Sequence, residues 1–374
     1  MAPPSDAIAA VSQRLERFLD DQSTAWADAG DEALLMIRSG RATLVGGKRL
    51  RARFAVTGWE AVAQAADPGA HPDALPGAHS GAEPGDDVIA AAAALEIFHA
   101  AALVHDDLID NSDTRRGRPA AHRALEADHV AAGWTGSAES FGRSGAVLLG
   151  DLLVAWSDDL LEEGLRSAVH AAEAREIYGY MRREVTIGQF LDIAEEAAFV
   201  RAPDAEHAER ALRVASLKSA RYSIERPLLL GAALAGADAA QTAALSAFGH
   251  PLGLAFQLRD DVLGVFGDSA VTGKPSGDDL REGKRTVLIA FARERMPEDE
   301  RHAFDALIGD PALDAAQIAA LQDTIRATGA LDRVEDLIAE YAREADDALV
   351  GAPLGDAAVA SLRSLARDAT ARVA

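Results

Sequence analysis

The stretch HDDLIDNSDTRRGRP, residues 105–119, places four Asp and three Arg directly after a nearly unbroken apolar run. On a helix, Asp106 and Asp110 lie one turn apart, about 6 Å along the axis, with Asp107 beside them. Carboxylates that share a face repel each other unless a cation lies between them. Magnesium suits that position, because it prefers oxygen ligands, takes one or two carboxylates and completes its shell with water and substrate phosphates.

Two other interpretations of this cluster compete with a metal site. It could be a solvated helix end in an acidic protein, and a short acidic motif alone favours that interpretation. The pattern argues against a calcium loop, since neither the Gly at its sixth position nor the Glu at its twelfth is present. Arg115, Arg116 and Arg118 could neutralise the nearby Asp residues, but guanidinium groups also bind phosphate oxygens. Carboxylates for metal beside arginines for phosphate favour a diphosphate held from both sides.

A second apolar helix is expected to end in paired acids about 150 residues later, in FQLRDDVLGVFGD (256–268). Asp260 and Asp261 form this pair, and Gln257 lies one turn before Asp260 on the same face. If the two helices face each other, carboxylates line opposite walls of a cavity.

Lys48 and Arg51 lie at i, i+3 near the start of an expected helix, where free backbone N–H groups and the positive end of the helix dipole suit an anion. A P-loop is excluded there, because the required earlier Gly and a preceding strand are missing. Lys274 and Lys284 flank a Gly-rich turn, and Lys218 lies in KSARY. For Lys48 and Arg51 alone a solvated basic patch is the preferred explanation, and for Lys218 the alternative is a plain surface lysine.

His99 lies seven residues before Asp106, two helical turns away on the same face. A lone His in such a helix is usually a core residue. The combination is more specific than its parts: two carboxylate pairs that end apolar helices, with at least two separate cation groups, imply two diphosphates and magnesium.

The elements that position these residues are predicted to be helices, since helical periodicity is nearly continuous and no segment alternates convincingly as a strand would. Half of the chain is apolar (49%), only 5% is aromatic, and the abundant Ala favours helix. We expect a flexible connection at 67–86, a second irregular segment at 133–145, and one all-α domain over 1–374. The expected helices are 5–38, 47–66, 86–112, 119–132, 144–163, 167–195, 204–220, 224–236, 239–266, 283–295, 298–308, 315–328, 330–350 and 355–372.

The composition excludes several classes of protein. A net charge of −23 argues against a general nucleic-acid binder, although local positive charge still allows an anionic substrate. The absence of Cys excludes disulfides and thiolate sites and fits a cytoplasmic location. The N-terminus lacks the basic and apolar regions of a signal peptide. The apolar run 88–104 contains Glu96 and His99, which indicates a core helix and no membrane span.

In their order and spacing, the motifs resemble those of the trans-type polyprenyl diphosphate synthase family. They run from GGKRLR through DDLIDNSDTRRGRP, GDLLVAW, GQFLD, KSARYSIERP and FQLRDDVLGVFGD to GKPSGDDLREGK, nearly the whole chain. The resemblance implies an isoprenoid-synthase-type helical bundle around a deep central cavity, usually a homodimer. It also implies head-to-tail condensation of isopentenyl diphosphate with an allylic diphosphate (dimethylallyl, geranyl or farnesyl) to a short- to medium-chain all-trans product.

Carried over position by position, the resemblance assigns roles to the motif residues. Those expected to bind isopentenyl diphosphate are Lys48, Arg51, His99 and Arg116. Those expected to serve the allylic diphosphate are Arg115, Lys218, Ser219, Gln257, Lys274 and Lys284. The expected ligands of a magnesium cluster, with three ions per site, are Asp106, Asp110 and Asp260, supported by Asp107 and Asp261.

The sequence departs from the family pattern at three positions. Gly264 stands where many relatives carry a third Asp, which questions a metal role for the end of that motif. Ser219 replaces the more usual Thr but keeps the hydroxyl. Ala52 follows Arg51 where Pro is common, a change expected to alter only local rigidity.

Two rival functions remain open. A class I terpene cyclase shares the fold and the first Asp motif, but it does not need an isopentenyl site, and its second motif carries Asn and Ser. A non-catalytic subunit of a heteromeric synthase is expected to lose carboxylates or cations, and here both sets are complete.

Product length depends on how far the hydrocarbon tail can run along the helix that precedes Asp106. Ala101 and Ala102, five and four residues earlier, are too small to stop a growing chain. Phe98 lies about 12 Å from Asp106 along the axis and is the first bulky candidate for a floor; it could instead pack in the core or at a subunit interface. As a floor, Phe98 predicts a product longer than farnesyl diphosphate, with geranylgeranyl diphosphate the expected one.

Overall fold

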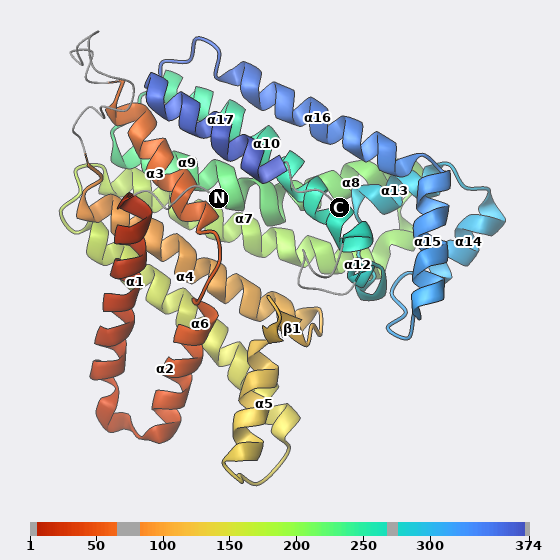
Figure 1. The fold of residues 1–374 in the computed structure, drawn as a ribbon, viewed down its shortest axis with the longest axis horizontal. Helices are drawn as coiled ribbons and strands as arrows, with labels where there is room; N and C mark the ends of the chain where they lie inside the picture. Colours follow the sequence, from red (N-terminus) through yellow and green to blue (C-terminus); the bar gives the residue numbers. More distant parts are fainter. Residues whose placement is uncertain (1–5, 66–82, 268–275, 371–374) are drawn as a thin grey trace. The chain divides into compact units, whose positions relative to one another are not determined.

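A computed structural model describes residues 6–65, 83–267 and 276–370 of the chain, and these residues are helical almost throughout (Figure 1). The all-α prediction is confirmed. The only strands in the described ranges are two-residue β1 (Thr114–Arg115) and β2 (Arg118–Pro119), which pair antiparallel just after the first acidic cluster. Most of the expected connection at 67–86 lies outside the described residues.

The chain folds into two compact units. The first comprises Met1–Ala174 with Leu230–Ala237, and the second comprises Arg175–Leu229 with Asp238–Ala374. The single domain over 1–374 stays a prediction.

The first unit is built on α4 (Asp86–Ile109), which packs along α6 (Ala138–Leu165). Small residues bring the two helices close, because a Cβ at Gly164 would lie only 2.5 Å from the Cβ of Ala90. The Ser157 hydroxyl also donates a hydrogen bond to the Ala94 carbonyl, at 2.6 Å. The other elements of this unit are α1 (Asp6–Ala25), η1 (Ala27–Ala29), α2 (Asp31–Thr43), α3 (Leu50–Ala63), α5 (Ala121–Ala131) and the last turn of α9 (Arg226–Leu234).

Among the described helices, α4 alone is long and apolar enough to cross a bilayer, with a mean hydropathy of 1.8. Of its most apolar window, 78% is buried inside the protein, as is typical of a core helix. The burial therefore agrees with the expectation from its sequence.

The second unit is organised around α10 (Ala239–Phe266), which packs against α16 (Ala330–Ala348) and the π-helical segment η4 (Ser216–Glu225). A capping box at Asp238 and Gln241 fixes the start of α10. The remaining elements are α7 (Ala171–Ala198), η2 (Phe199–Arg201), η3 (Asp204–Glu206), α8 (His207–Ala215), α12 (Asp278–Glu282), α13 (Val287–Glu294), α14 (Glu298–Leu307), α15 (Ala315–Ala327) and α17 (Asp356–Thr370).

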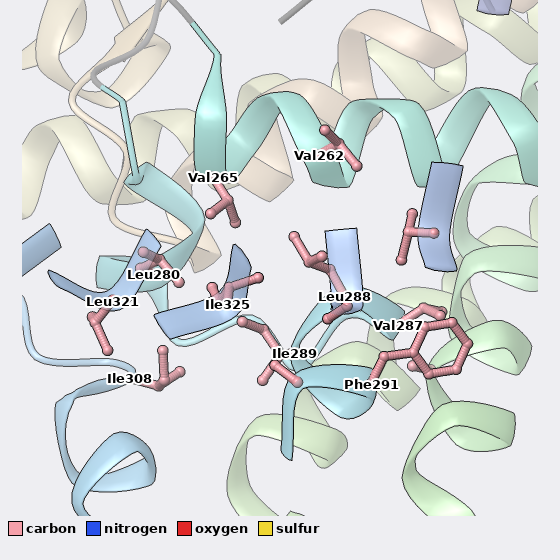
Figure 2. Packing of buried hydrophobic residues seen from close by; sticks show 14 of the residues in the cluster. Val262, Val265, Leu280, Val287, Leu288, Ile289, Phe291, Ile308, Leu321 and Ile325 are labelled. Atoms are coloured by element: carbon pink, nitrogen blue, oxygen red, sulfur yellow. The ribbon is translucent and has the colours of Figure 1, made fainter. Parts of the chain in front are cut away.

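A hydrophobic cluster holds the C-terminal end of α10, where the second acidic pair lies (Figure 2). Val262 and Val265 of α10 belong to it, together with Leu280 of α12, Leu288 of α13 and Ile325 of α15. Because these side chains are fully or almost fully buried, the position of this helix end depends on three neighbouring elements. The acidic pair is therefore held by a packed scaffold.

Three expected helix boundaries are wrong. The helix expected at 5–38 is two helices, α1 and α2, because the chain turns through η1 to Gly30, whose φ of 98° favours glycine. The segment 133–145 is helical from Ala138, where the Ser137 side chain accepts a hydrogen bond from the Ser140 N–H. The break expected near 220–224 is absent, since α8, η4 and α9 follow one another directly.

Candidate active site

The loop that carries Lys48 and the tip that carries Arg116 meet in the first unit. Gly46 and Gly47 have φ values of 80° and 87°, and a Cβ at Gly47 would lie 2.9 Å from Nη1 of Arg116. The positive φ of Gly47 favours glycine, and the missing side chain lets the guanidinium lie directly against the loop. Two of the residues expected to bind isopentenyl diphosphate are thus brought together by a glycine turn.

The tip itself is a two-residue hairpin loop, a structure that the sequence analysis missed. Arg116 and Gly117 both have positive φ (53° and 71°), as in a type I′ turn, and Arg115 pairs with Arg118 across the ladder. The loop separates neighbouring arginines, since Arg116 lies at its tip and Arg115 on its first strand. The sequence signal that could have indicated this hairpin is the Arg116–Gly117 dipeptide, because a Gly at the second loop position favours a type I′ turn.

His99 lies within this cation group as a neutral side chain. Burial lowers its pKa well below the usual value, and Arg51, Arg116, Arg115 and Arg49 lower it further. At neutral pH the imidazole can donate a hydrogen bond but adds no charge. The arginines around it make the surroundings strongly positive, which suits an anion.

The start of α3 differs from the expectation in one respect. The N–H of Ala52, expected to be free for an anion, donates a hydrogen bond of 3.1 Å to Oε1 of buried Glu96. The Ala in place of Pro at position 52 therefore changes more than rigidity, because Pro has no N–H to donate.

The carboxylates that end α4 divide into an anchored one and two partly exposed ones. Asp107 is buried, and Arg115 donates to it through Nε at 2.8 Å and through Nη2. The same Nη2 lies 3.5 Å from Oδ2 of Asp106. Asp106 and Asp110 keep partial exposure and are the carboxylates of α4 that could reach a metal ion. Arg115, assigned to the allylic diphosphate, already holds a carboxylate in this structure.

His105, which the sequence analysis did not single out, fixes α4 against α6. Its Nε2 lies 3.3 Å from the Val147 carbonyl and 3.6 Å from Oδ1 of Asp151. A Cβ at Gly150 would lie 2.1 Å from this nitrogen, so the Gly of GDLLVAW makes room for the ring. The residue next to Asp106 is thereby held in register.

In the second unit, Asp260 is exposed and Asp261 is buried. Burial raises the pKa of Asp261 to about 8, and the carboxylates of Asp279, Asp260 and Asp192 act in the same direction. Gln257 opposes this shift by donating a hydrogen bond of 2.6 Å to Oδ1 of Asp261. Gln257 therefore contacts a carboxylate, and Asp260 is the exposed member of the pair.

The space at Gly264 is filled by another carboxylate. A Cβ at this position would lie 2.0 Å from Oδ2 of Asp279, which comes from α12. Where many relatives carry a third Asp, this chain therefore places an acidic group from GKPSGDDLREGK. The sequence analysis missed Asp279, because its position depends on the packing of α12 against α10.

Lys218 lies in η4, and π-helical turns are frequent at functional sites. Its Nζ donates to Oδ2 of Asp192 at 2.5 Å, and a Cβ at Gly188 would lie 2.4 Å from its backbone N. Ser219 is partly buried beside it. Lys284 forms an ion pair of 2.6 Å with Glu282. Lys274 lies outside the described residues.

Residues 36–325 match the Polyprenyl synthetase family. A crystal structure of geranylgeranyl pyrophosphate synthase from Corynebacterium glutamicum superimposes with a TM-score of 0.89 at 41% identity, covering 100% of both chains. The heptaprenyl diphosphate synthase component 2 of Geobacillus stearothermophilus is 30% identical over 97% of this chain and 94% of its own.

A third relative, the short chain isoprenyl diphosphate synthase of Methanocaldococcus jannaschii, is 31% identical over 60% of this chain and 62% of its own length. By their names, these relatives make prenyl diphosphates of different chain length. They agree on the class of reaction, and the family match spans most of the chain. The chain belongs to the polyprenyl synthetase family and is a prenyltransferase.

Proposed function

We propose that this chain condenses isopentenyl diphosphate with an allylic diphosphate, of the dimethylallyl, geranyl or farnesyl series, and releases geranylgeranyl diphosphate. The observation that carries the proposal is the arrangement along α4. This one helix bears His99, within a cluster of arginines, and Asp106 two turns later, and Asp110 is its C-cap residue. A diphosphate site and a metal site thus follow each other on one rigid element.

The divalent metal that this family uses fits the carboxylates of the two acidic clusters. Within the described residues, no group of three or more Asp, Glu or His side chains could by itself enclose an ion. Magnesium does not need such a group, since one or two carboxylates and substrate phosphates suffice. Asp106, Asp110 and Asp260 would hold it, and three ions is the number we propose. The Corynebacterium structure is a complex with isoprenyl diphosphate and magnesium.

The charge of each residue and the contacts that hold it in place suggest its role in the condensation. Magnesium, when bound, would neutralise the departing diphosphate as a Lewis acid. Lys48, Arg51 and Arg116 would hold isopentenyl diphosphate while neutral His99 donates a hydrogen bond to it. Lys218 would add fixed positive charge at the allylic diphosphate as its C–O bond breaks. The double bond of isopentenyl diphosphate then attacks the allylic cation, and proton loss to the released diphosphate completes the step.

We propose a cytoplasmic homodimer. Exposed apolar side chains support an interface on α6, where Leu148 is 60% exposed, and on α7, where Ile187 and Phe190 are 55% and 68% exposed. A mass of one chain, 39.2 kDa, in sedimentation would contradict the dimer.

Asp106→Ala is expected to reduce turnover by at least about a thousandfold, the scale of losing one strong electrostatic stabiliser. The test supplies isopentenyl and allylic diphosphates with and without magnesium and identifies products by chromatography. Asp128→Ala, which changes an exposed Asp of α5, is the control. Near-normal turnover of Asp106→Ala at saturating magnesium would contradict the proposal that Asp106 is a metal ligand. A cyclised hydrocarbon from the wild-type chain would favour a class I terpene cyclase. The absence of any product would favour a non-catalytic subunit.

Lys48→Ala and Arg116→Ala are expected to raise mainly the KM for isopentenyl diphosphate, and Lys218→Ala mainly that for the allylic substrate. The reason is that each cation group serves one diphosphate. Titration of each substrate at saturating concentrations of the other measures the split. Arg118→Ala, on the second strand of the hairpin, is the control. Equal effects on both constants would contradict the two-site division.

Gly264→Ala is expected to raise the magnesium concentration for half-maximal activity several-fold. The added methyl group must displace the Asp279 carboxylate, which is the end of a side chain and can move without unfolding the protein. Gly179→Ala on α7 is the matched control, since its Cβ meets its nearest neighbour at 3.6 Å, an ordinary contact. An unchanged magnesium dependence in a folded Gly264→Ala protein would show that the place of Asp279 is unimportant.

Phe98→Ala is expected to lengthen the product while turnover survives, because removal of the ring opens the floor proposed for the hydrocarbon tail. Phe98 and Ala101 are buried in the first unit, and Ala102 is partly exposed. Ile97→Ala, which removes a neighbouring buried side chain of α4, controls for general loosening of the helix. Unchanged product length in an active, folded Phe98→Ala protein would place the floor elsewhere.

A further inference from the structure

Glu96 is a buried acidic residue for which the proposed mechanism has no use. It lies on α4 one turn before His99 and is only 6% exposed. Its charge acts on Arg116, and its Oε2 lies 3.6 Å from Nη1 of Arg49. A negative charge here works against the binding of an anionic substrate. Its presence therefore calls for another reason.

The contacts of Glu96 supply that reason, because both of its oxygens bind the start of α3. Oε1 accepts the hydrogen bond from Ala52, the third residue of this helix, whose first N–H groups have no partner within the helix. Within the described residues, the side chain of Arg49 at the N-cap makes no capping hydrogen bond. Glu96 thus caps α3 from a different helix.

The turn that Glu96 holds is one that does not form easily by itself. Arg49 has a φ of 50°, a left-handed conformation that residues with side chains rarely adopt. Its guanidinium bridges two elements, since Nη1 lies near Glu96 while Nη2 donates to the Leu44 carbonyl at the end of α2, at 2.8 Å. Lys48 directly precedes this residue, and Arg51 follows it by two positions.

We propose that Glu96 is a positioning residue for isopentenyl diphosphate: it fixes the first turn of α3 on α4 and thereby holds Lys48 and Arg51 in place before the substrate arrives. The inference rests on the proposed function, which assigns these two cations to that substrate. Glu96 acts through them and does not touch the diphosphate. The gain is preorganisation, because side chains that are already ordered lose little freedom on binding.

Four variants test this role. Glu96→Ala removes the anchor, and Glu96→Gln keeps an oxygen acceptor for the Ala52 N–H but loses the charge. Glu96→Ala combined with Ala52→Pro replaces the anchor by a residue whose ring fixes φ and which needs no acceptor. Ser157→Ala is the matched control, because it removes another buried hydrogen bond to α4 and leaves the cation group intact.

Glu96→Ala is expected to raise the KM for isopentenyl diphosphate about tenfold, as for one lost charge-assisted hydrogen bond. The KM for the allylic substrate should stay within about twofold, and hydrogen exchange at the Ala52 amide should accelerate. Glu96→Gln should cost about threefold. The double variant should recover most of the loss, and Ser157→Ala should lower the thermal midpoint with both constants unchanged.

The outcomes separate this inference from the proposed function. If Lys48→Ala leaves the KM for isopentenyl diphosphate unchanged, the proposed function fails, while hydrogen exchange at Ala52 still tests the anchor. If Lys48→Ala raises that constant and Glu96→Ala does not, the role of Glu96 is overturned. Equal changes in both constants, or no recovery in the double variant, overturn it too. Should Glu96→Ala not fold, the two constants and the Ala52 exchange of Glu96→Gln decide in the same way.

Discussion

The constraint on which this structure depends is the repulsion among the charges that we propose to bind the substrates and the metal. Each charge that is to meet a diphosphate or a metal ion must stay in place while neither is bound. Like charges at a few ångströms repel strongly where water is excluded. Unless fixed partners offset that repulsion, the helices that carry the charges would be pushed apart.

Three groups of like charges among the described residues each contain a partner of the opposite charge. Arg115 neutralises Asp107 at the end of α4, and Glu96 lies among the arginines at the start of α3. In the second unit, Asp192 pairs with Lys218. At Asp261 the repulsion is relieved by protonation instead of by a cation. Burial and neighbouring carboxylates raise its pKa, so that it can remain protonated while no cation is near. Asp107 and Asp261 are thus buried, while Asp106 stays partly exposed and Asp260 exposed.

Glycines decide where these partners can lie. At Gly47, Gly150, Gly188 and Gly264 an added Cβ would lie within 3 Å of a charged residue or of His105. Three of the four are helical glycines, which weaken a helix through their conformational freedom. Here that cost accompanies a close approach, because an added Cβ would force the neighbouring atoms to shift. Glycines within the motifs therefore give as much information about the site as the charged residues do.

This explains which features were predictable from the sequence. Helical periodicity and abundant Ala predicted the all-α fold. The types and spacing of the acidic and basic residues predicted which of them could bind metal and diphosphate. The contacts of Glu96, His105 and Asp279 depend on packing between segments that are distant in sequence, so no local pattern shows them. The hairpin at residues 114–119 was missed because two-residue strands are too short to produce an alternating pattern.

Position 52 shows how a small departure from a family pattern is explained only by the contacts around it. From the sequence, Ala in place of Pro looked like a loss of rigidity. In the structure the same change supplies a backbone N–H, and a buried carboxylate accepts its hydrogen bond. A covalent restraint on the turn and a hydrogen bond from a neighbouring helix are two means to the same end. The second makes the position of the cations depend on α4, the helix that also carries the carboxylates proposed to bind the metal.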